Sequence, residues 1–138
     1  MAIIQTQTTS FKAECWQAVH NLLTDTIKIA LYTGNASLTE ATTVYTTSNE
    51  VVASGYTAGG NTLTGVSINS SDYTAYANWA NTSWTGSITA RCALIYNASK
   101  GNKSIAVIDF GSDKSSVVTF LITMPANTAT SALIRNSN

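Results

Sequence analysis

The chain has 138 residues, enough for one domain with its own core, and its 7 basic and 7 acidic residues balance to a formal net charge of zero. Only 10% of the residues are charged, compared with about 25% in an average soluble domain. The cations are scattered, which argues against nucleic-acid binding, and no apolar run approaches the roughly 20 residues that span a membrane. The first residues lack the basic and apolar regions of a signal peptide.

Thr, Ser and Asn are abundant, so the surface must be solvated mainly by neutral polar side chains. Uncharged polar residues suit strands and turns. A charge-poor surface with no net charge favours self-association. Composition therefore predicts either a protein that works by making contacts with others or a soluble protein of an extracellular setting.

The N-terminal part predicts an irregular arm over residues 1–9 and then a helix over residues 10–23. Apolar residues recur there at spacings of three and four, and Ser10 is a suitable N-cap. The apolar stripe consists of Phe11, Cys15, Trp16, Val19, Leu22 and Leu23. This is the one good helix in the sequence.

The middle of the chain predicts one strand and one long loop. Residues 26–33 alternate, with Ile27, Ile29 and Leu31 on one face. Residues 36–61 have little regularity apart from a possible short strand at 42–47, and we expect a long exposed loop. Loops of this length in compact domains are usually functional or mobile.

From residue 62 onward the sequence predicts strands at regular spacing. They are expected at 62–69, 73–80, 87–97, 103–110, 116–124 and 131–135, with turns at 98–102 and 111–114. In the strand at 116–124 we expect Val118, Phe120, Ile122 and Met124 to face the core. The fold predicted is therefore mainly β, a single domain over residues 1–138, as an antiparallel β-sandwich or jelly-roll-like fold with one short N-terminal α-helix.

No residue pattern predicts catalysis or a cofactor. The one histidine, His20, lies inside the predicted helix and has no recognisable partner for a triad. Cys15 and Cys92 lie in apolar patterns and are expected to be buried free thiols, too few for a zinc site without carboxylates. Asp109 and Asp113 flank a predicted turn, and capping of that turn is a better explanation than calcium binding. We therefore expect a protein that is not an enzyme and holds no cofactor or metal.

The aromatic residues of the second half permit two interpretations. Trp79 and Trp84 lie near Tyr73, Tyr76 and Tyr96 in strand patterns. They could form a patch that stacks on sugars or contacts a protein. An edge of the core between two sheets is the interpretation that strand spacing favours.

Seven short motifs follow one another in a specific order along nearly the whole chain. They are SFKAE (10–14), DTIKIALYT (25–33), VYTTSNEV (44–51), GYTAGG (55–60), TARCALIYN (89–97), VIDFGSDK (107–114) and SALIR (131–135). In these motifs and their order the chain resembles a family of small virion proteins of tailed bacteriophages, encoded among head and tail structural genes. The motifs are structural and carry no catalytic signature.

The resemblance implies a structural component of a phage particle, assembled in the host bacterial cytoplasm. The role expected first is a capsid decoration (cement) protein that bridges and stabilises major capsid subunits as a homo-oligomer, with a trimer favoured, and without contact to nucleic acid or membrane. The alternative is a tail, collar or fibre component for host attachment, which would bind a glycan through Trp79, Trp84 and Tyr76. The residues expected to make protein contacts are Tyr45, Tyr56, Gly59, Gly60 and Trp84, together with the chain ends 1–9 and 136–138.

Overall fold

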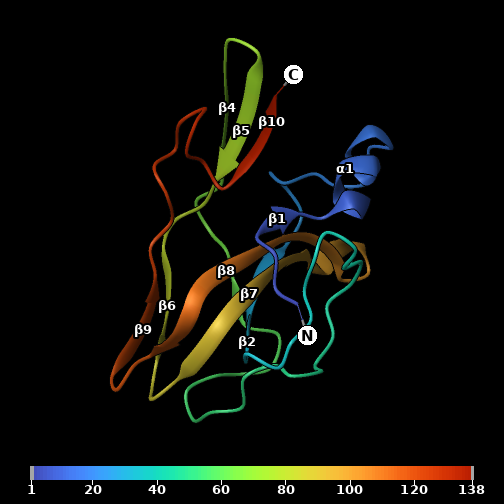
Figure 1. The fold of residues 1–138 in the computed structure, drawn as a ribbon. Coiled ribbons are helices and arrows are strands. Elements are labelled where there is room, and N and C mark those ends of the chain that lie inside the picture. Colours follow the sequence, from blue (N-terminus) through green and yellow to red (C-terminus); the bar gives the residue numbers. More distant parts are fainter. Residues whose placement is uncertain (1, 138) are drawn as a thin grey trace.

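The computed structural model describes residues 2–137, and its largest element is a five-stranded antiparallel sheet (Figure 1). The order across this sheet is β1-β8-β7-β2-β3. Its strands are β1 (Thr6–Gln7), β8 (Lys103–Ser115), β7 (Thr89–Asn97), β2 (Ile27–Tyr32) and β3 (Asn61–Thr62). Strands β7 and β8 form a long hairpin, joined by the 3-10 helix η1 (Ala98–Lys100). Part of the expected N-terminal arm is thus a strand that docks on β8.

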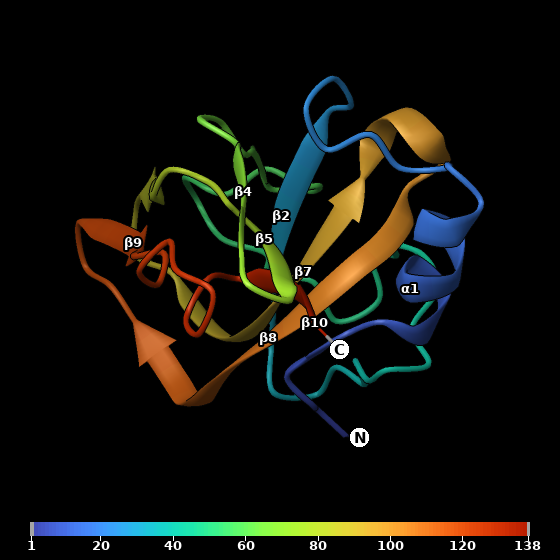
Figure 2. The same ribbon diagram turned by 90° about the horizontal axis from the view of Figure 1, so that it is seen from above.

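Two smaller antiparallel sheets accompany the large one. One has the order β10-β5-β4, with β10 (Ile134–Ser137), β5 (Thr74–Asn78) and β4 (Ser67–Ser71). The other pairs β6 (Thr82–Thr85) with β9 (Thr119–Ile122). The view from above places both smaller sheets over one face of the large sheet (Figure 2). The predicted mainly β fold of packed antiparallel sheets with one short N-terminal helix is confirmed.

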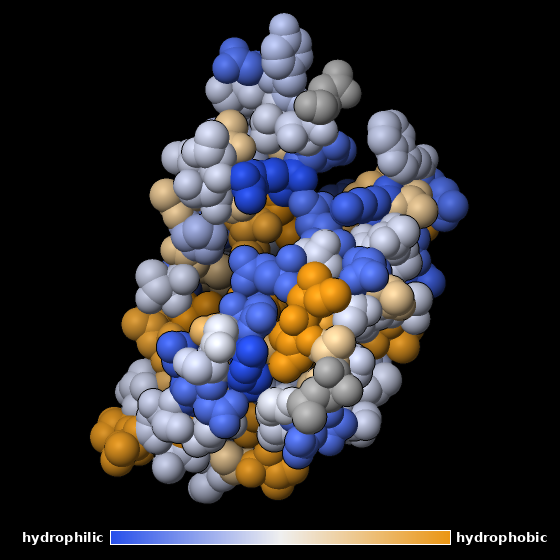
Figure 3. Space-filling model, in the orientation of Figure 1, coloured by the Kyte–Doolittle hydropathy of each residue, from blue (hydrophilic) through white to orange (hydrophobic). Residues whose placement is uncertain are grey.

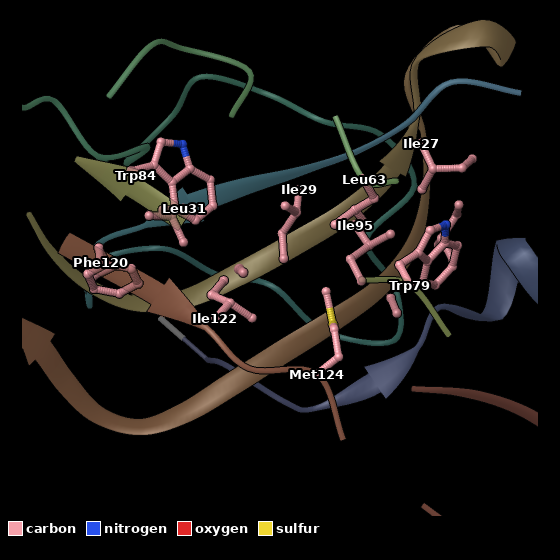
Figure 4. Close-up of a cluster of buried hydrophobic side chains, with 14 of the residues drawn as sticks. Ile27, Ile29, Leu31, Leu63, Trp79, Trp84, Ile95, Phe120, Ile122 and Met124 are labelled. Carbon is pink, nitrogen blue, oxygen red and sulfur yellow. The ribbon is translucent and has the colours of Figure 1, made fainter. Parts of the chain in front are cut away.

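The main core lies between the large sheet and the two smaller ones (Figure 4). Ile27, Ile29 and Leu31 of β2 face this core, as their alternation predicts. The smaller sheets and the segments next to them contribute Trp79, Trp84, Phe120, Ile122 and Met124. Full burial of one such large apolar side chain contributes about 1.5–3 kcal/mol. Val118, which was expected to join them, is 69% exposed, so that part of the prediction is wrong.

The opposite face of the large sheet is also buried. Ala30 and Tyr32 of β2 lie there with Cys92, Leu94, Tyr96 and Val107 of β7 and β8. Ala36 and Leu38 cover this face, and the backbone of Leu38 pairs with that of Ile3. The expectation that residues 36–61 form an exposed loop is therefore wrong in part. The segment has almost no strand structure, but it supplies the second cover that a sheet with two apolar faces requires.

Helix α1 (Thr9–Trp16) is half as long as predicted. Thr8 is the N-cap instead of Ser10, and its hydroxyl accepts a hydrogen bond from the N–H of Phe11 at 3.3 Å. The helix ends where Ala18 adopts a positive φ of 57°. Residues 17–26 are instead held by side-chain hydrogen bonds to the end of β7, which override the apolar periodicity of the sequence.

Several strand boundaries also differ from the prediction. Strand β8 continues through residues 111–114, where a turn was expected, and pairs with β7 as far as Ser115 opposite Thr89. Gly111 (φ 83°) and a register shift let the strand bend there without ending. The predicted strand at 62–69 is divided into β3 and β4, and the possible strand at 42–47 is one bridge between Val44 and Lys103.

Candidate assembly surface

Three of the four residues expected to make contacts in the segment 36–61 meet at a buried carboxylate. Glu50 is only 6% exposed. Its side chain accepts hydrogen bonds from the hydroxyl of Tyr45 at 2.7 Å, the hydroxyl of Tyr56 at 2.6 Å and the backbone N–H of Gly59 at 2.7 Å. A buried charge is tolerated when it is compensated in this way. We call this group of four residues the Glu50 clasp.

The Glu50 clasp is joined to both strands at the centre of the large sheet. The hydroxyl of Tyr56 accepts a hydrogen bond from the backbone N–H of Leu31 in β2 at 2.9 Å. The hydroxyl of Tyr96 in β7 donates to the carbonyl oxygen of Gly59 at 2.7 Å. Burial raises the pKa of the Tyr56 hydroxyl, and the hydrogen bond to Glu50 raises it further. Burial likewise raises the pKa of Tyr96 to about 12. These phenols therefore stay protonated and keep donating.

Gly60 is required by a close approach of two backbone segments. Its φ is +75°, and a Cβ atom at this position would lie 1.8 Å from the carbonyl oxygen of Ile29. A side chain is excluded there unless the backbone of β2 moves. The GYTAGG motif is thus explained by internal packing. Tyr56 and Gly59 are buried and Gly60 is half-buried, so their surroundings are the protein's own interior.

Trp84, the fifth residue expected to make contacts, is 5% exposed. Its ring packs against Phe120 at a centroid distance of 6.3 Å and against Tyr56 at 5.8 Å. Trp79 and Tyr96 are buried as well. The core interpretation thus holds for Trp79, Trp84 and Tyr96, whereas Tyr73 is exposed and Tyr76 is partly exposed. Trp79 and Trp84 are too buried to offer the face of an indole ring to a glycan, whereas Tyr76 is partly exposed, and glycan binding stays a prediction.

Tyr45 differs from the other members of the clasp because it is partly exposed. Its ring stacks on that of Tyr96, with centroids 4.6 Å apart. Burial raises the pKa of the Tyr45 hydroxyl, with a further increase from its hydrogen bond to Glu50. Of the five residues expected to make contacts, Tyr45 is the one whose side chain reaches both the clasp and the surface, and its role in contacts stays a prediction.

His20 belongs to a second hydrogen-bonded group, which holds the end of α1 to the end of β7. Its Nε2 lies 2.9 Å from Oε1 of Glu14, and its Nδ1 lies 3.0 Å from the amide nitrogen of Asn97. That amide also donates to Asp25 at 2.8 Å, and Lys100 lies 3.3 Å from the same carboxylate. The imidazole side chain is 1% exposed. His20 is therefore a packed side chain whose two ring nitrogens both have partners within the fold.

Neither cysteine is paired in a disulfide within the described chain. Cys92 is buried in the second face of the large sheet, as expected. Cys15 is exposed on α1, so the expectation of burial is wrong for that residue. The helix is too short to turn its whole predicted apolar stripe toward the core.

The surface that remains for contacts lies mainly at the two ends of the molecule. At one end the three-stranded sheet β10-β5-β4 projects from the body (Figure 1). Asp72 and Tyr73 form the turn between β4 and β5, and the Tyr73 side chain is 84% exposed. Most of β4 and most of β10 are exposed, whereas in β5 Ala75 alone is exposed. We call this three-stranded sheet with its Asp72–Tyr73 turn the projecting unit.

A groove separates the projecting unit from helix α1. Its apolar lining includes Phe11, Leu22, Ile68, Ala77 and Ile134, and its volume is about 450 Å³. Trp16 stands at its border with its ring 85% exposed. The space-filling view shows the notch between the projecting unit and the helix (Figure 3). Sequence reasoning missed this groove because Trp16 was assigned to a buried helical stripe.

The other end carries a smaller apolar surface. Val117 and Val118, in the turn between β8 and β9, are exposed, and Leu121 of β9 is exposed beside them. This turn between β8 and β9 lies at the opposite end of the molecule from the turn between β4 and β5 (Figure 1). Exposed apolar groups that cluster at one place are typical of contact surfaces.

No group of three or more His, Cys, Asp or Glu side chains is placed to hold a metal ion within residues 2–137. Over the same residues, no helix has the length and apolar character to cross a membrane. Comparisons with protein-family models, with curated proteins and with solved structures find no match to this chain. The geometry of the exposed surface, together with the sequence, is therefore the basis for a functional proposal.

Proposed function

We propose that this chain is a structural component of a tailed-phage particle, a capsid decoration (cement) protein that bridges and stabilises major capsid subunits as a homo-oligomer, with a trimer favoured. No catalytic role is part of the proposal. The observation that carries it is the projecting unit, a sheet that leaves the body and presents Tyr73 at its tip. The order of motifs along the chain supports a place in the virion.

The distribution of charge supports a role in contacts. Most carboxylates of the body are already compensated, because Glu14, Asp25 and Asp109 form ion pairs and Glu50 is held by its clasp. The exposed surface is dominated by Thr, Ser and Asn, which are easily desolvated compared with charged groups. Such a surface can be covered by neighbouring subunits without the cost of burying unpaired charges.

The projecting unit supports bridging in particular. It has polar, solvent-exposed strands and an aromatic residue at the tip, which are features of a contact element that ends in an anchor side chain. Many copies on one shell would make each weak contact effective through avidity.

The test is to locate the chain on the particle of the phage that encodes it. We expect mass spectrometry of purified particles to detect the chain. We expect cryo-electron microscopy to place its density on the outside of the capsid shell, with the projecting unit against a neighbouring subunit of the shell. Particles made without the chain should lose DNA at a lower temperature. Absence of the chain from purified particles contradicts the proposal, and density on the tail, collar or fibres supports the alternative position.

A further inference from the structure

The groove between α1 and the projecting unit has a positive charge that no residue among those the structure describes neutralises. Lys12 and Arg135 line it, and the other polar residues of the lining are neutral. Within residues 2–137, neither Lys12 nor Arg135 takes part in an ion pair, and Arg135 donates only to the backbone carbonyl oxygen of Thr130, at 2.7 Å. An occupant that combines an apolar or aromatic group with a negative charge suits this lining.

The tip of the projecting unit has the complementary composition. Ser71 and Thr74 pair across the hairpin, so Asp72 and Tyr73 alone form the turn. Asp72 is exposed, has a positive φ of 53°, and forms no ion pair among the described residues. The tip therefore presents one carboxylate and one aromatic ring on adjacent residues, and neither has a side-chain partner within residues 2–137.

We propose that the Asp72–Tyr73 tip of one copy inserts into the α1 groove of a second copy. Tyr73 packs there against Trp16 and the apolar floor, and Asp72 pairs with Lys12 and Arg135. The exposed Tyr73 and Trp16 rings are both covered by this contact, which is a recurrent use of aromatic residues at interfaces.

The proposed contact is heterologous, because a tip meets a groove and each copy offers one of each. Such contacts close into a ring when the rotation between copies allows it, and otherwise continue as a chain. This inference deepens the proposed homo-oligomer and rests on that part of the proposed function. The two surfaces that meet are the Asp72–Tyr73 tip of one copy and the α1 groove of the next.

An engineered disulfide tests the contact directly, because the exposed Cys15 is among the residues that line the groove. We expect the Tyr73→Cys variant to form covalent dimers and larger species under mild oxidation, with a disulfide between Cys15 and the introduced thiol, identified by peptide mass spectrometry. Cys92 is buried and should stay out of the reaction. Monomeric protein, or a disulfide formed within one chain, would overturn the inference.

Two matched controls separate this disulfide from random collisions. The Cys15→Ser/Tyr73→Cys variant keeps the introduced thiol at the tip but removes the thiol of the groove, and it should yield few dimers. The Val117→Cys variant places a thiol of equal exposure at the opposite end of the molecule. Its coupling to Cys15 should stay at least tenfold slower than that of Tyr73→Cys. Equal rates would overturn the inference.

Charge exchange tests the same contact without a covalent bond. In sedimentation velocity over a concentration series, we expect Asp72→Lys to weaken self-association at least tenfold, and Asp72→Lys combined with Lys12→Glu to recover part of the loss. Both residues are exposed, so circular dichroism should show an unchanged fold. An unchanged association constant for Asp72→Lys, or no recovery in the double variant, contradicts the inference.

These results are independent of the particle experiment. If the chain is found on particles but the disulfide and the charge exchange fail, the contact surfaces are wrong and the proposed function stands. If the tip and the groove are coupled but the chain is absent from particles, the proposed function is wrong and the self-association stands.

Discussion

The Glu50 clasp and the projecting unit use similar residues for opposite purposes. Each has a tyrosine close to a carboxylate in a turn-rich segment, Tyr56 with Glu50 in one and Tyr73 with Asp72 in the other. In the clasp the phenol donates to the carboxylate, and both are buried. At the tip both are exposed, and neither has a partner in the described part of the chain. Residue type alone therefore does not distinguish a structural element from a contact surface, and burial does.

The largest difference is expected when one aromatic side chain is removed from each region: Trp84, which packs against Tyr56 of the clasp, and Tyr73 at the tip. Trp84→Ala should destabilise the fold by about 3–5 kcal/mol, because it leaves a cavity between Tyr56 and Phe120. Tyr73→Ala should change stability by less than about 0.5 kcal/mol, as expected for an exposed side chain. Urea unfolding of the two variants measures both values. Equal losses would mean that the tip is packed in the folded protein.

Removal of the carboxylates should give the next largest contrast. Glu50→Ala leaves two hydroxyls and one backbone N–H without their acceptor, and we expect a loss of at least about 3 kcal/mol, since each unsatisfied buried group costs about 1–3 kcal/mol. Asp72→Ala should be nearly neutral. The same urea series tests this pair, and a neutral Glu50→Ala would show that water replaces the carboxylate and that the clasp is not a structural element.

Two glycines with left-handed backbone conformations allow a finer comparison. Gly60 and Gly101 have φ values of 75° and 64°, so Ala at either position adds strain of about 1–2 kcal/mol. Only at Gly60 does the new Cβ collide with the backbone of β2, whereas Gly101 faces open space. Gly60→Ala should therefore lower the melting temperature clearly more than Gly101→Ala does. Equal shifts would indicate that the segment 55–60 moves away from β2 at little cost.

The smallest predicted effect depends on pH. The pKa of Asp25 is held below its ordinary value, chiefly by the hydrogen bond from the N–H of Asn21, and also by Asn97 and Lys100. Folding thus favours the charged form, so this contribution is present above an unfolded pKa of about 3.9 and is lost as the pH falls through the lower folded pKa.

Asp25→Asn should therefore be less stable than the original chain at about pH 6, and the difference should shrink as the pH falls through the acidic range in which the original carboxylate takes up its proton. Thermal unfolding at several pH values measures this change. Asp72→Asn is the control and should show no such trend. A stability difference for Asp25→Asn that stays constant down to strongly acidic pH would contradict the assignment.

Sequence reasoning worked where periodicity and burial coincide. The alternation in β2 placed Ile27, Ile29 and Leu31 in the core, and the spacing of short strands gave the fold class. The prediction of the helix end failed because Val19, Leu22 and Leu23 continue the apolar spacing. In the structure, the side-chain amide of Asn97 is hydrogen-bonded to His20 and donates to Asp25, and these bonds to a distant residue hold the segment in a non-helical form. Such contacts between residues far apart in sequence leave no local signal.

The burial of Tyr56, Gly59 and Trp84 was missed for a related reason. A glycine-rich segment with a tyrosine is typical of an exposed loop, and nothing local shows that Tyr56 and Gly59 meet Glu50. Tyr73 was expected at the start of the strand at 73–80, and it lies instead in the turn with Asp72, at the exposed tip. The groove depends on the packing of α1 beside β5 and β10, which no pattern within either segment encodes.

The central claim is that the projecting unit makes contacts while the Glu50 clasp maintains the fold. Hydrogen–deuterium exchange of the full chain over a concentration series tests it most directly. We predict that peptides covering residues 45–60 are protected at every concentration, and that peptides covering residues 68–76 gain protection as the concentration rises. Protection that rises with concentration in residues 45–60, with none gained in residues 68–76, would contradict the account.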